Sequence, residues 1–189
     1  MNTATAILRK EHEAILRMLD VAEEVSRRLD RGEPVAPETL AGLLEFFKLF
    51  ADQCHHGKEE DLLFPALERK GMPRHGGPLA VMLAEHDQGR AFVHEMTEAA
   101  KAYPQDPAAA RRWLQASAGY QALLREHIHK ENDILFVMAE RMLSAAEQAE
   151  LAAAFERAEE EKMGRGTHER LHALMDQLAA AVFPAETRK

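Results

Sequence analysis

The chain has 189 residues, of which 46% are hydrophobic and 30% are charged, and its formal net charge is −8. This composition is typical of a soluble globular domain, and the negative charge argues against nucleic-acid or anionic-membrane partners, which require clustered positive charge. No apolar run of about 18 residues could span a membrane, and the N-terminal residues lack the features of a secretory signal. We therefore expect a cytoplasmic protein with no nucleic-acid or membrane partner.

Proline and glycine divide the chain into long segments with helical periodicity. The fourth segment begins at Asp106, a favourable N-cap residue, followed by Pro107 in the first turn. No alternation typical of strands occurs, so we predict an all-α protein. The four long helices are expected over residues 5–31, 37–70, 78–103 and 106–142.

Two further helices are expected near the C-terminus. Ser144 and Glu147 form the pattern of a capping box, which predicts a fifth helix up to Met163. Thr167 follows a Gly-Arg-Gly loop and is expected to cap a sixth helix, which would end near Phe183.

Short connections between the first four segments favour antiparallel neighbours. The sequence therefore predicts an up-down-up-down four-helix bundle over residues 1–142. Residues 143–189 would form a C-terminal helical extension with two additional helices, and we expect it to pack on the bundle.

Two segments of the chain resemble each other. HHGKEEDLLFPALE at residues 55–68 and HIHKENDILFVMAE at residues 127–140 are identical at half of their positions, and each contains His-x-x-x-Glu. The preceding helices carry the related triplets EHE at 11–13 and EHD at 85–87. Each half of the bundle would thus contribute one lone histidine and one His-x-x-x-Glu pair.

Helical projection separates the histidines into inward and outward groups, since residues three or four apart share a face. His56 and Glu60 project onto a wetter face than their neighbours His55 and Glu59, so we expect them outside the core. The polar residues that project onto apolar faces are His12, His55, Glu59, His86, His127 and Glu131.

This set of side chains predicts a metal site. A lone core histidine or a single His-x-x-x-Glu pair is more often structural, but two carboxylates in an apolar core cost several kcal/mol each unless they are compensated. Two divalent cations would provide that compensation, because imidazole suits iron, zinc, copper and nickel and carboxylates can bridge two ions. With four histidines and two glutamates, each ion would have about four protein ligands and open positions.

Residues 5–142 resemble the hemerythrin-like proteins with an HHE cation-binding domain, through His12, HHGKEEDLLFPAL, the Glu-His pair at 85–86 and REHIHKENDILF at 125–136. The resemblance implies a non-haem di-iron centre held by the six residues above, and it leaves open whether an oxo bridge joins the two iron ions. Oxygen-carrying hemerythrins have a second histidine four residues after the third-helix ligand, where this chain has Arg90. The resemblance is therefore to relatives tied to nitric oxide, redox sensing or iron–sulfur cluster repair.

The positions of several other residues predict roles for them. Two residues, Tyr120, which lies seven residues before His127, and Arg90, are candidates for contacts with the metal-binding side chains. Cys54 is the single cysteine, which excludes an intramolecular disulfide, and it is expected to be a small core residue. The remaining assignments are structural: Lys58 and Lys130 on the bundle exterior, and His168 and His172 as a surface pair without a third ligand.

Three functions remain open. The protein could bind or sense a small diatomic molecule or oxidant, namely O₂, nitric oxide or peroxide, at an open iron position. It could instead be an enzyme that acts on nitric oxide or peroxide, or an iron donor in iron–sulfur cluster repair. In the third alternative, zinc or mixed metals only stabilise the bundle. The sequence identifies no protein partner and no oligomeric state.

Overall fold

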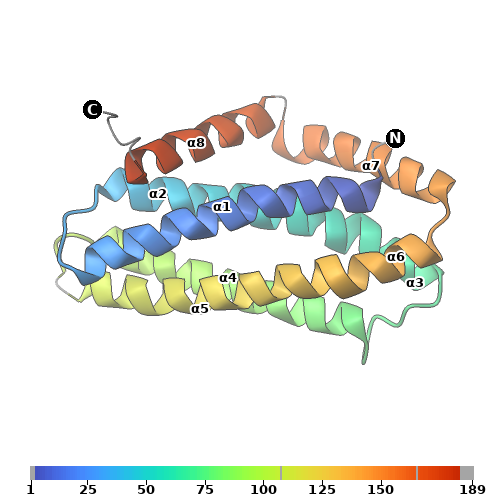
Figure 1. Ribbon diagram of the computed structural model, residues 1–189, viewed down its shortest axis with the longest axis horizontal. Helices are drawn as coiled ribbons and strands as arrows, with labels where there is room; N and C mark the ends of the chain where they lie inside the picture. Colours follow the sequence, from blue (N-terminus) through green and yellow to red (C-terminus); the bar gives the residue numbers. More distant parts are fainter. Residues whose placement is uncertain (1–2, 107, 165, 184–189) are drawn as a thin grey trace, which may run out of the picture.

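The computed structural model describes residues 3–106, 108–164 and 166–183, and within these ranges all regular structure is helical (Figure 1). The prediction of an all-α protein is confirmed. None of the helices in these ranges combines the length and the apolar character needed to cross a membrane. In chain order the elements are α1 (Ala4–Asp30), α2 (Pro37–Phe46), η1 (Phe47–His56), η2 (Glu59–Leu63), α3 (Phe64–Arg69), α4 (Pro78–Ala102), α5 (Ala109–Lys130), η3 (Glu131–Leu135), α6 (Phe136–Met142), α7 (Ala145–Met163) and α8 (Thr167–Val182).

Four antiparallel rods form the bundle, as predicted (Figure 1). The first rod is α1 and the third is α4, while the second joins α2, η1, η2 and α3 and the fourth joins α5, η3 and α6. The additional helices α7 and α8 follow one another along the side of the bundle formed by α1 and α2 (Figure 1). The ligand-bearing parts of all four rods can therefore meet in one interior.

The C-terminal helices pack closely on the bundle. Phe155 of α7 and Leu171 of α8 are fully buried. At Gly42, in α2, an added Cβ would lie only 3.0 Å from Cδ2 of Leu178 in α8. Glycine at this position thus lets the two helices approach each other.

Two of the three predicted N-cap residues differ from the structure. The Ser144–Glu147 capping box is present at the start of α7, but Thr167 is not a cap: its hydroxyl donates to the Met163 carbonyl, 2.6 Å away, at the end of α7. The α-helix of the fourth rod begins at Ala109, three residues after Asp106, and Asp106 accepts from the Ala108 N–H in the turn before it. Pro107 lies outside the described residues.

Three segments, η1, η2 and η3, are π-helical, whereas a single α-helical period was expected through both rods. A π-helical turn closes i→i+5 hydrogen bonds and so contains more residues than an α-helical turn. Each residue therefore advances by a smaller rotation, and sequence neighbours stay closer to one face. These segments coincide with the two repeated His-x-x-x-Glu motifs, consistent with the frequent occurrence of π-bulges at functional sites.

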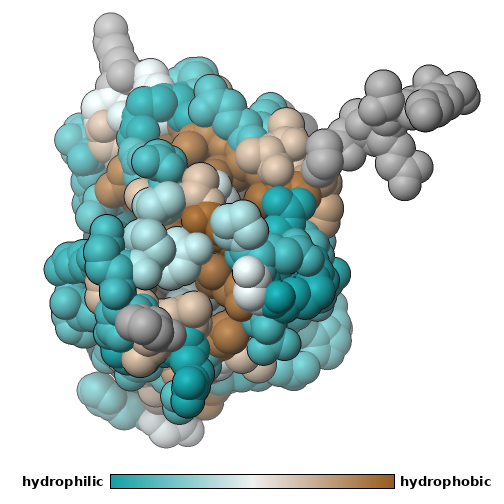
Figure 2. All heavy atoms as spheres, turned by 90° about the vertical axis from the view of Figure 1, so that its left-hand side faces the viewer, coloured by the Kyte–Doolittle hydropathy of each residue, from teal (hydrophilic) through white to brown (hydrophobic). Residues whose placement is uncertain are grey.

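A layer of buried polar residues divides the apolar interior into two clusters. One cluster includes Phe47 and Trp113 and extends toward the end of α1. The other includes Leu8, Phe64 and Phe136 and lies at the opposite end. Seen from the end where α1 finishes, hydrophilic side chains cover the flanks and hydrophobic ones come into view between them (Figure 2).

Candidate metal centre

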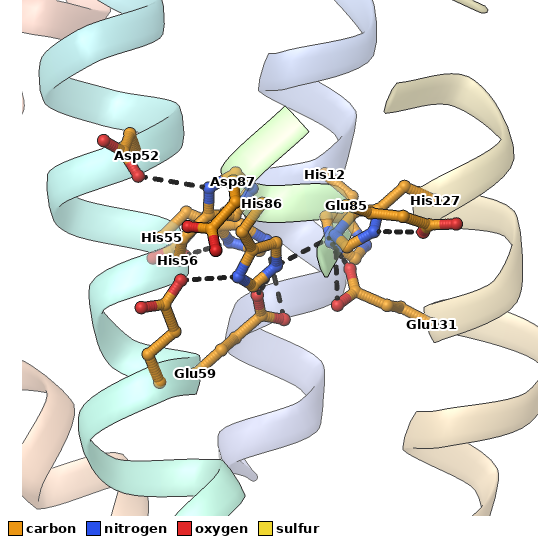
Figure 3. A network of polar contacts seen from close by, with 12 residues as sticks. His12, Asp52, His55, His56, Glu59, Glu85, His86, Asp87, His127 and Glu131 are labelled. Atoms are coloured by element: carbon orange, nitrogen blue, oxygen red, sulfur yellow. Dashed lines mark hydrogen bonds and ion pairs between the residues drawn. The ribbon is translucent and has the colours of Figure 1, made fainter. Parts of the chain in front are cut away.

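Five histidines direct their rings into the polar layer between the two apolar clusters (Figure 3). All of them are buried, and they come from all four rods: His12 from α1, His55 and His56 from η1, His86 from α4 and His127 from α5. Sequence projection anticipated four of these rings and placed the fifth, His56, outside the core.

His56 is buried because of the π-helical segment that ends with it. The smaller rotation per residue keeps it on the inner side together with His55. Its side chain is only 5% exposed, and its ring stacks on that of His86, with centroids 3.9 Å apart. The placement of His56 on a wetter face was therefore wrong, and the ring of His56 joins the other four in the buried layer. The adjacent pair of histidines was a signal, but periodicity at 3.6 residues could not interpret it.

Glu59 and Glu131 complete the layer at the first positions of η2 and η3. Both side chains have no exposed surface, and none of their carboxylate oxygens has a hydrogen-bond partner within the described part of the chain. Unpartnered buried charges are costly and therefore rare. The groups that face these oxygens are imidazole nitrogens, at 3.2–3.5 Å, and the described part of the chain places no lysine or arginine against them. A bound cation would compensate both carboxylates.

The donor atoms form two groups that share Glu59. Within each group, one nitrogen or oxygen atom per residue lies within 4.8 Å of the others. Nε2 of His86 and Nε2 of His127 are 3.1 Å apart, and Nε2 of His12 is 3.2 Å from Oε2 of Glu131. The groups are His56, Glu59, His86 and His127 on one side, and His12, His55, Glu59 and Glu131 on the other.

A side-chain oxygen lies behind every one of the five imidazoles. When Nδ1 of a histidine donates to such an oxygen, Nε2 is left with its lone pair directed at the centre. This is the arrangement that metal-binding histidines usually have. The Nδ1 contacts are His12 to Asn132 Oδ1 at 3.0 Å, His55 to Glu11 Oε2 at 2.9 Å, His56 to Asp52 Oδ1 at 3.4 Å, His86 to Glu60 Oε1 at 2.6 Å and His127 to Glu85 Oε2 at 2.9 Å.

Cationic side chains hold these backing carboxylates in place. Lys58 contacts Glu11, and Lys130 contacts Glu85. Lys58 is only 3% exposed, so its expected position on the bundle exterior was wrong. Lys130 is about one-third exposed, and its ammonium pairs with Glu85, the carboxylate behind His127. Burial alone would raise the pKa of Glu11, but its hydrogen bond with His55 and the charge of Lys58 outweigh burial and lower it.

Arg90 holds two more of the backing carboxylates. Its Nε lies 2.8 Å from Asp52 and its Nη2 lies 2.6 Å from Glu60. Arg90 thus lies behind the histidines. Tyr120 is buried with its ring 4.8 Å from that of Phe47, and together with Arg90 and His56 it lines a cavity of about 160 Å³.

The electrostatics differ among the imidazoles of the centre. For His127, the charges and hydrogen bonds of Glu131 and Glu85 outweigh burial and raise the pKa. Burial lowers the pKa of His55 to about 4, and burial together with the neighbouring His86 also lowers the pKa of His56. Burial and the charge of Glu131 both raise the pKa of Glu59. For Glu131, His127 and His12 outweigh burial and lower the pKa, so this carboxylate stays ionised.

The residues present fit a pair of divalent transition-metal ions. Neutral imidazole nitrogens and carboxylate oxygens are suitable ligands for such ions, and the unpartnered atoms are the ones that would ligate them. One group offers three imidazoles and the other offers two. Glu59 belongs to both groups and could bridge the ions.

Comparison with known proteins gives a consistent result. A model of the hemerythrin HHE cation-binding domain matches residues 3–139. An uncharacterized protein of Mycobacterium tuberculosis is 27% identical over 165 residues, which are 86% of this chain and 63% of that protein. No solved structure matches the chain significantly.

Proteins with an assigned role are also similar to this chain. The iron-sulfur cluster repair protein YtfE of Yersinia pseudotuberculosis is 32% identical over 139 residues, covering 70% of this chain and 60% of YtfE. YtfE of Salmonella typhimurium is 30% identical over 118 residues, covering 59% of this chain and 53% of YtfE. The chain thus spans less than two-thirds of the length of these relatives.

Proposed function

Because the chain belongs to the hemerythrin HHE cation-binding domain family, we propose that it is a non-haem di-iron protein that binds or senses a small diatomic molecule or oxidant, such as O₂, nitric oxide or peroxide. The observation that carries this proposal is the pair of buried, unpartnered carboxylates among five inward-facing imidazoles. Two iron ions would supply a redox-active centre with positions for an external ligand. His12, His55, His56, Glu59, His86, His127 and Glu131 would hold them.

The number of donors supports open coordination positions. Each group contains four residues, one of which is shared. Iron in a site of nitrogen and oxygen ligands commonly accommodates about six donors, and sites that leave positions open are those that bind small molecules. The group of His12 and His55 has two imidazoles against three in the other group, so the two ions would differ in the number of positions left open.

The size of the adjacent cavity supports a small ligand. His56, Tyr120 and Arg90 line a space of about 160 Å³, whereas pockets for drug-sized organic molecules occupy about 300–1,000 Å³. Its lining combines the rings of Phe47 and Tyr120 with the polar side chains of Asp52 and Thr97. These dimensions favour a diatomic molecule or peroxide over a larger substrate.

Metal analysis and rapid mixing test the proposal. We expect about two iron ions per chain after expression in iron-replete medium, and a change in the absorption spectrum when the reduced protein is mixed with O₂ or nitric oxide. The matched control is His129→Gln, because His129 is an exposed histidine that pairs with Asp133 and does not line this cavity. Zinc as the sole bound metal, or an iron-loaded protein that responds to none of O₂, nitric oxide and peroxide, would overturn the proposal.

A role in iron–sulfur cluster repair is the second candidate, supported by the similarity to YtfE proteins. In that case the two bundle irons would be cargo delivered to a damaged cluster. Incubation of the iron-loaded chain with a cluster-depleted iron–sulfur protein should then lower the iron content of the chain as clusters form. Iron that remains on the chain while clusters form from an added iron salt would exclude the donor role.

A further inference from the structure

A second pair of histidines faces each other outside the bundle. His168 and His172 lie one turn apart at the start of α8, with their Nε2 atoms 2.9 Å apart. Nδ1 of His168 lies 2.7 Å from Oε1 of Glu159 in α7. Sequence spacing alone offered this pair no third partner, and the fold brings Glu159 to it from the neighbouring helix.

The arrangement repeats a feature of the bundle centre. There, Nε2 of His86 and Nε2 of His127 are 3.1 Å apart, and each ring is backed at Nδ1 by a carboxylate. Two nitrogen ligands at about 2.0–2.1 Å from one ion and at right angles to each other are about 3 Å apart. The distance between His168 and His172 therefore matches two adjacent positions on a single metal ion.

The pair opens into a cavity that has room for the rest of a coordination sphere. This cavity of about 460 Å³ lies between α1, α7 and α8. His168 and His172 line it together with the carboxylate-bearing Glu13 and Glu156. Three cationic residues, Lys10, Arg17 and Lys58, also line it. Arg17 pairs with Asp176 at 2.7 Å, and Lys58 pairs with Glu11 and Glu159. Carboxylate or water oxygens could thus fill positions that the two imidazoles leave open.

We propose that His168 and His172 form a binding site for a single divalent transition-metal ion, separate from the bundle centre, with Glu159 orienting the ring of His168. Imidazole ligands suit Fe²⁺, Co²⁺, Ni²⁺ and Zn²⁺, and the carboxylate behind His168 fixes the tautomer that directs Nε2 toward the ion. The partly exposed rings and the open cavity make this a site for exchangeable metal.

The neighbouring cysteine is not part of this site. Cys54, Glu159 and His168 also lie within ligand distance of one another, but the Lys58 ammonium occupies the place of a cation, 3.3 Å from Sγ of Cys54 and 2.6 Å from Oε2 of Glu159. Burial raises the pKa of Cys54 to about 12, which disfavours the thiolate needed for metal binding. The imidazole pair is the better donor set.

Titration with Ni²⁺ tests the proposal on the full chain whose bundle has been loaded with iron. Calorimetry should detect one Ni²⁺ beyond the iron of the bundle, and iron analysis before and after the titration shows that the bundle metal stays in place. His172→Gln and His168→Gln should each weaken Ni²⁺ binding at least about tenfold, and Glu159→Gln should weaken it about 10–100-fold. Both histidines are partly exposed, so these variants should remain folded.

The matched control is His129→Gln. His129 is an exposed histidine in contact with Asp133, four residues later, at 2.8 Å, so this variant removes one surface imidazole without touching the proposed site. It should bind Ni²⁺ as the unaltered chain does. Absence of an additional Ni²⁺, or unchanged affinity in His172→Gln, would mean that the 2.9 Å contact is only an N–H···N hydrogen bond. Because bundle iron is measured separately, this result is independent of the di-iron proposal.

Discussion

The rings of His56 and His86 stack with centroids 3.9 Å apart and planes inclined by 14°. The two residues come from different rods, and each ring has an acidic side chain behind it, Asp52 for His56 and Glu60 for His86. Arg90 contacts both of these carboxylates. One guanidinium thus orients two neighbouring imidazoles of the candidate centre.

Replacement of His56 by glutamine should lower metal binding. Loss of a residue that only backs a ligand typically costs about 10–100-fold in metal affinity, so loss of the ligand itself should cost at least about tenfold. We expect His56→Gln and His55→Gln both to reduce the iron content after gel filtration with a dilute chelator. His94→Gln, on the exposed face of α4, should retain the full iron content. Normal iron content in His56→Gln would remove His56 from the ligand set.

Replacement of Lys58 by methionine should destabilise the fold strongly. The variant leaves the buried Glu11 carboxylate without its cation, and breaking a buried ion pair costs about 3–5 kcal/mol. Urea denaturation at fixed metal content measures the effect. Lys162→Met is the control, because Lys162 is half exposed and pairs with Asp61 at the surface, where an ion pair contributes about 0–1 kcal/mol. Equal effects of the two substitutions would contradict the structural role of Lys58.

Glu59→Gln should have opposite effects with and without metal. In chelator-treated protein, the substitution removes a buried carboxyl group whose raised pKa lowers the stability of the fold near neutral pH, and it should stabilise the fold by about 1 kcal/mol or more. In metal-loaded protein it removes a shared ligand and should lower both metal content and stability. Thermal denaturation with and without chelator measures both effects. Glu95→Gln alters an exposed carboxylate and should change neither. A loss of stability in chelator-treated Glu59→Gln would show that the carboxylate has a partner of its own.

The contribution of His168 to stability should depend on pH. The Glu159 carboxylate, 2.7 Å from Nδ1 of His168, outweighs burial and raises the pKa of His168 above the ordinary value of 6.5. A group whose pKa is raised in the folded state contributes stability that is complete below its unfolded value and is lost as pH rises through its folded value. In chelator-treated protein, the difference in free energy of unfolding between the unaltered chain and His168→Gln should therefore be larger at about pH 5.5 than at about pH 8.5.

The size of this effect should be modest because His168 is about one-third exposed. Urea denaturation at both pH values measures it, and His129→Gln again serves as the control, since His129 lies largely in solvent. A difference that grows with rising pH would mean that the neutral form of His168 is the one stabilised by the fold.

Local residue chemistry was sufficient to predict the class of fold. The first two rods are long segments with helical periodicity. Gly32 and Gly71, both with left-handed backbones, follow their ends. The capping box at Ser144 likewise depends on contacts within one turn. Thr167 was misinterpreted because its hydroxyl donates to α7, a contact with residues before the loop.

The sequence by itself determined that six polar side chains would face an apolar interior, because His12, His55, Glu59, His86, His127 and Glu131 each recur at helical spacing with apolar residues. Only the tertiary structure decided that His56 joins them, since π-helical turns change the rotation per residue and leave no mark in the spacing. It also decided that Lys58 is buried, because α7 brings Glu159 over the bundle to pair with it. Contacts between distant segments depend on how the rods and the added helices pack, which local periodicity does not specify.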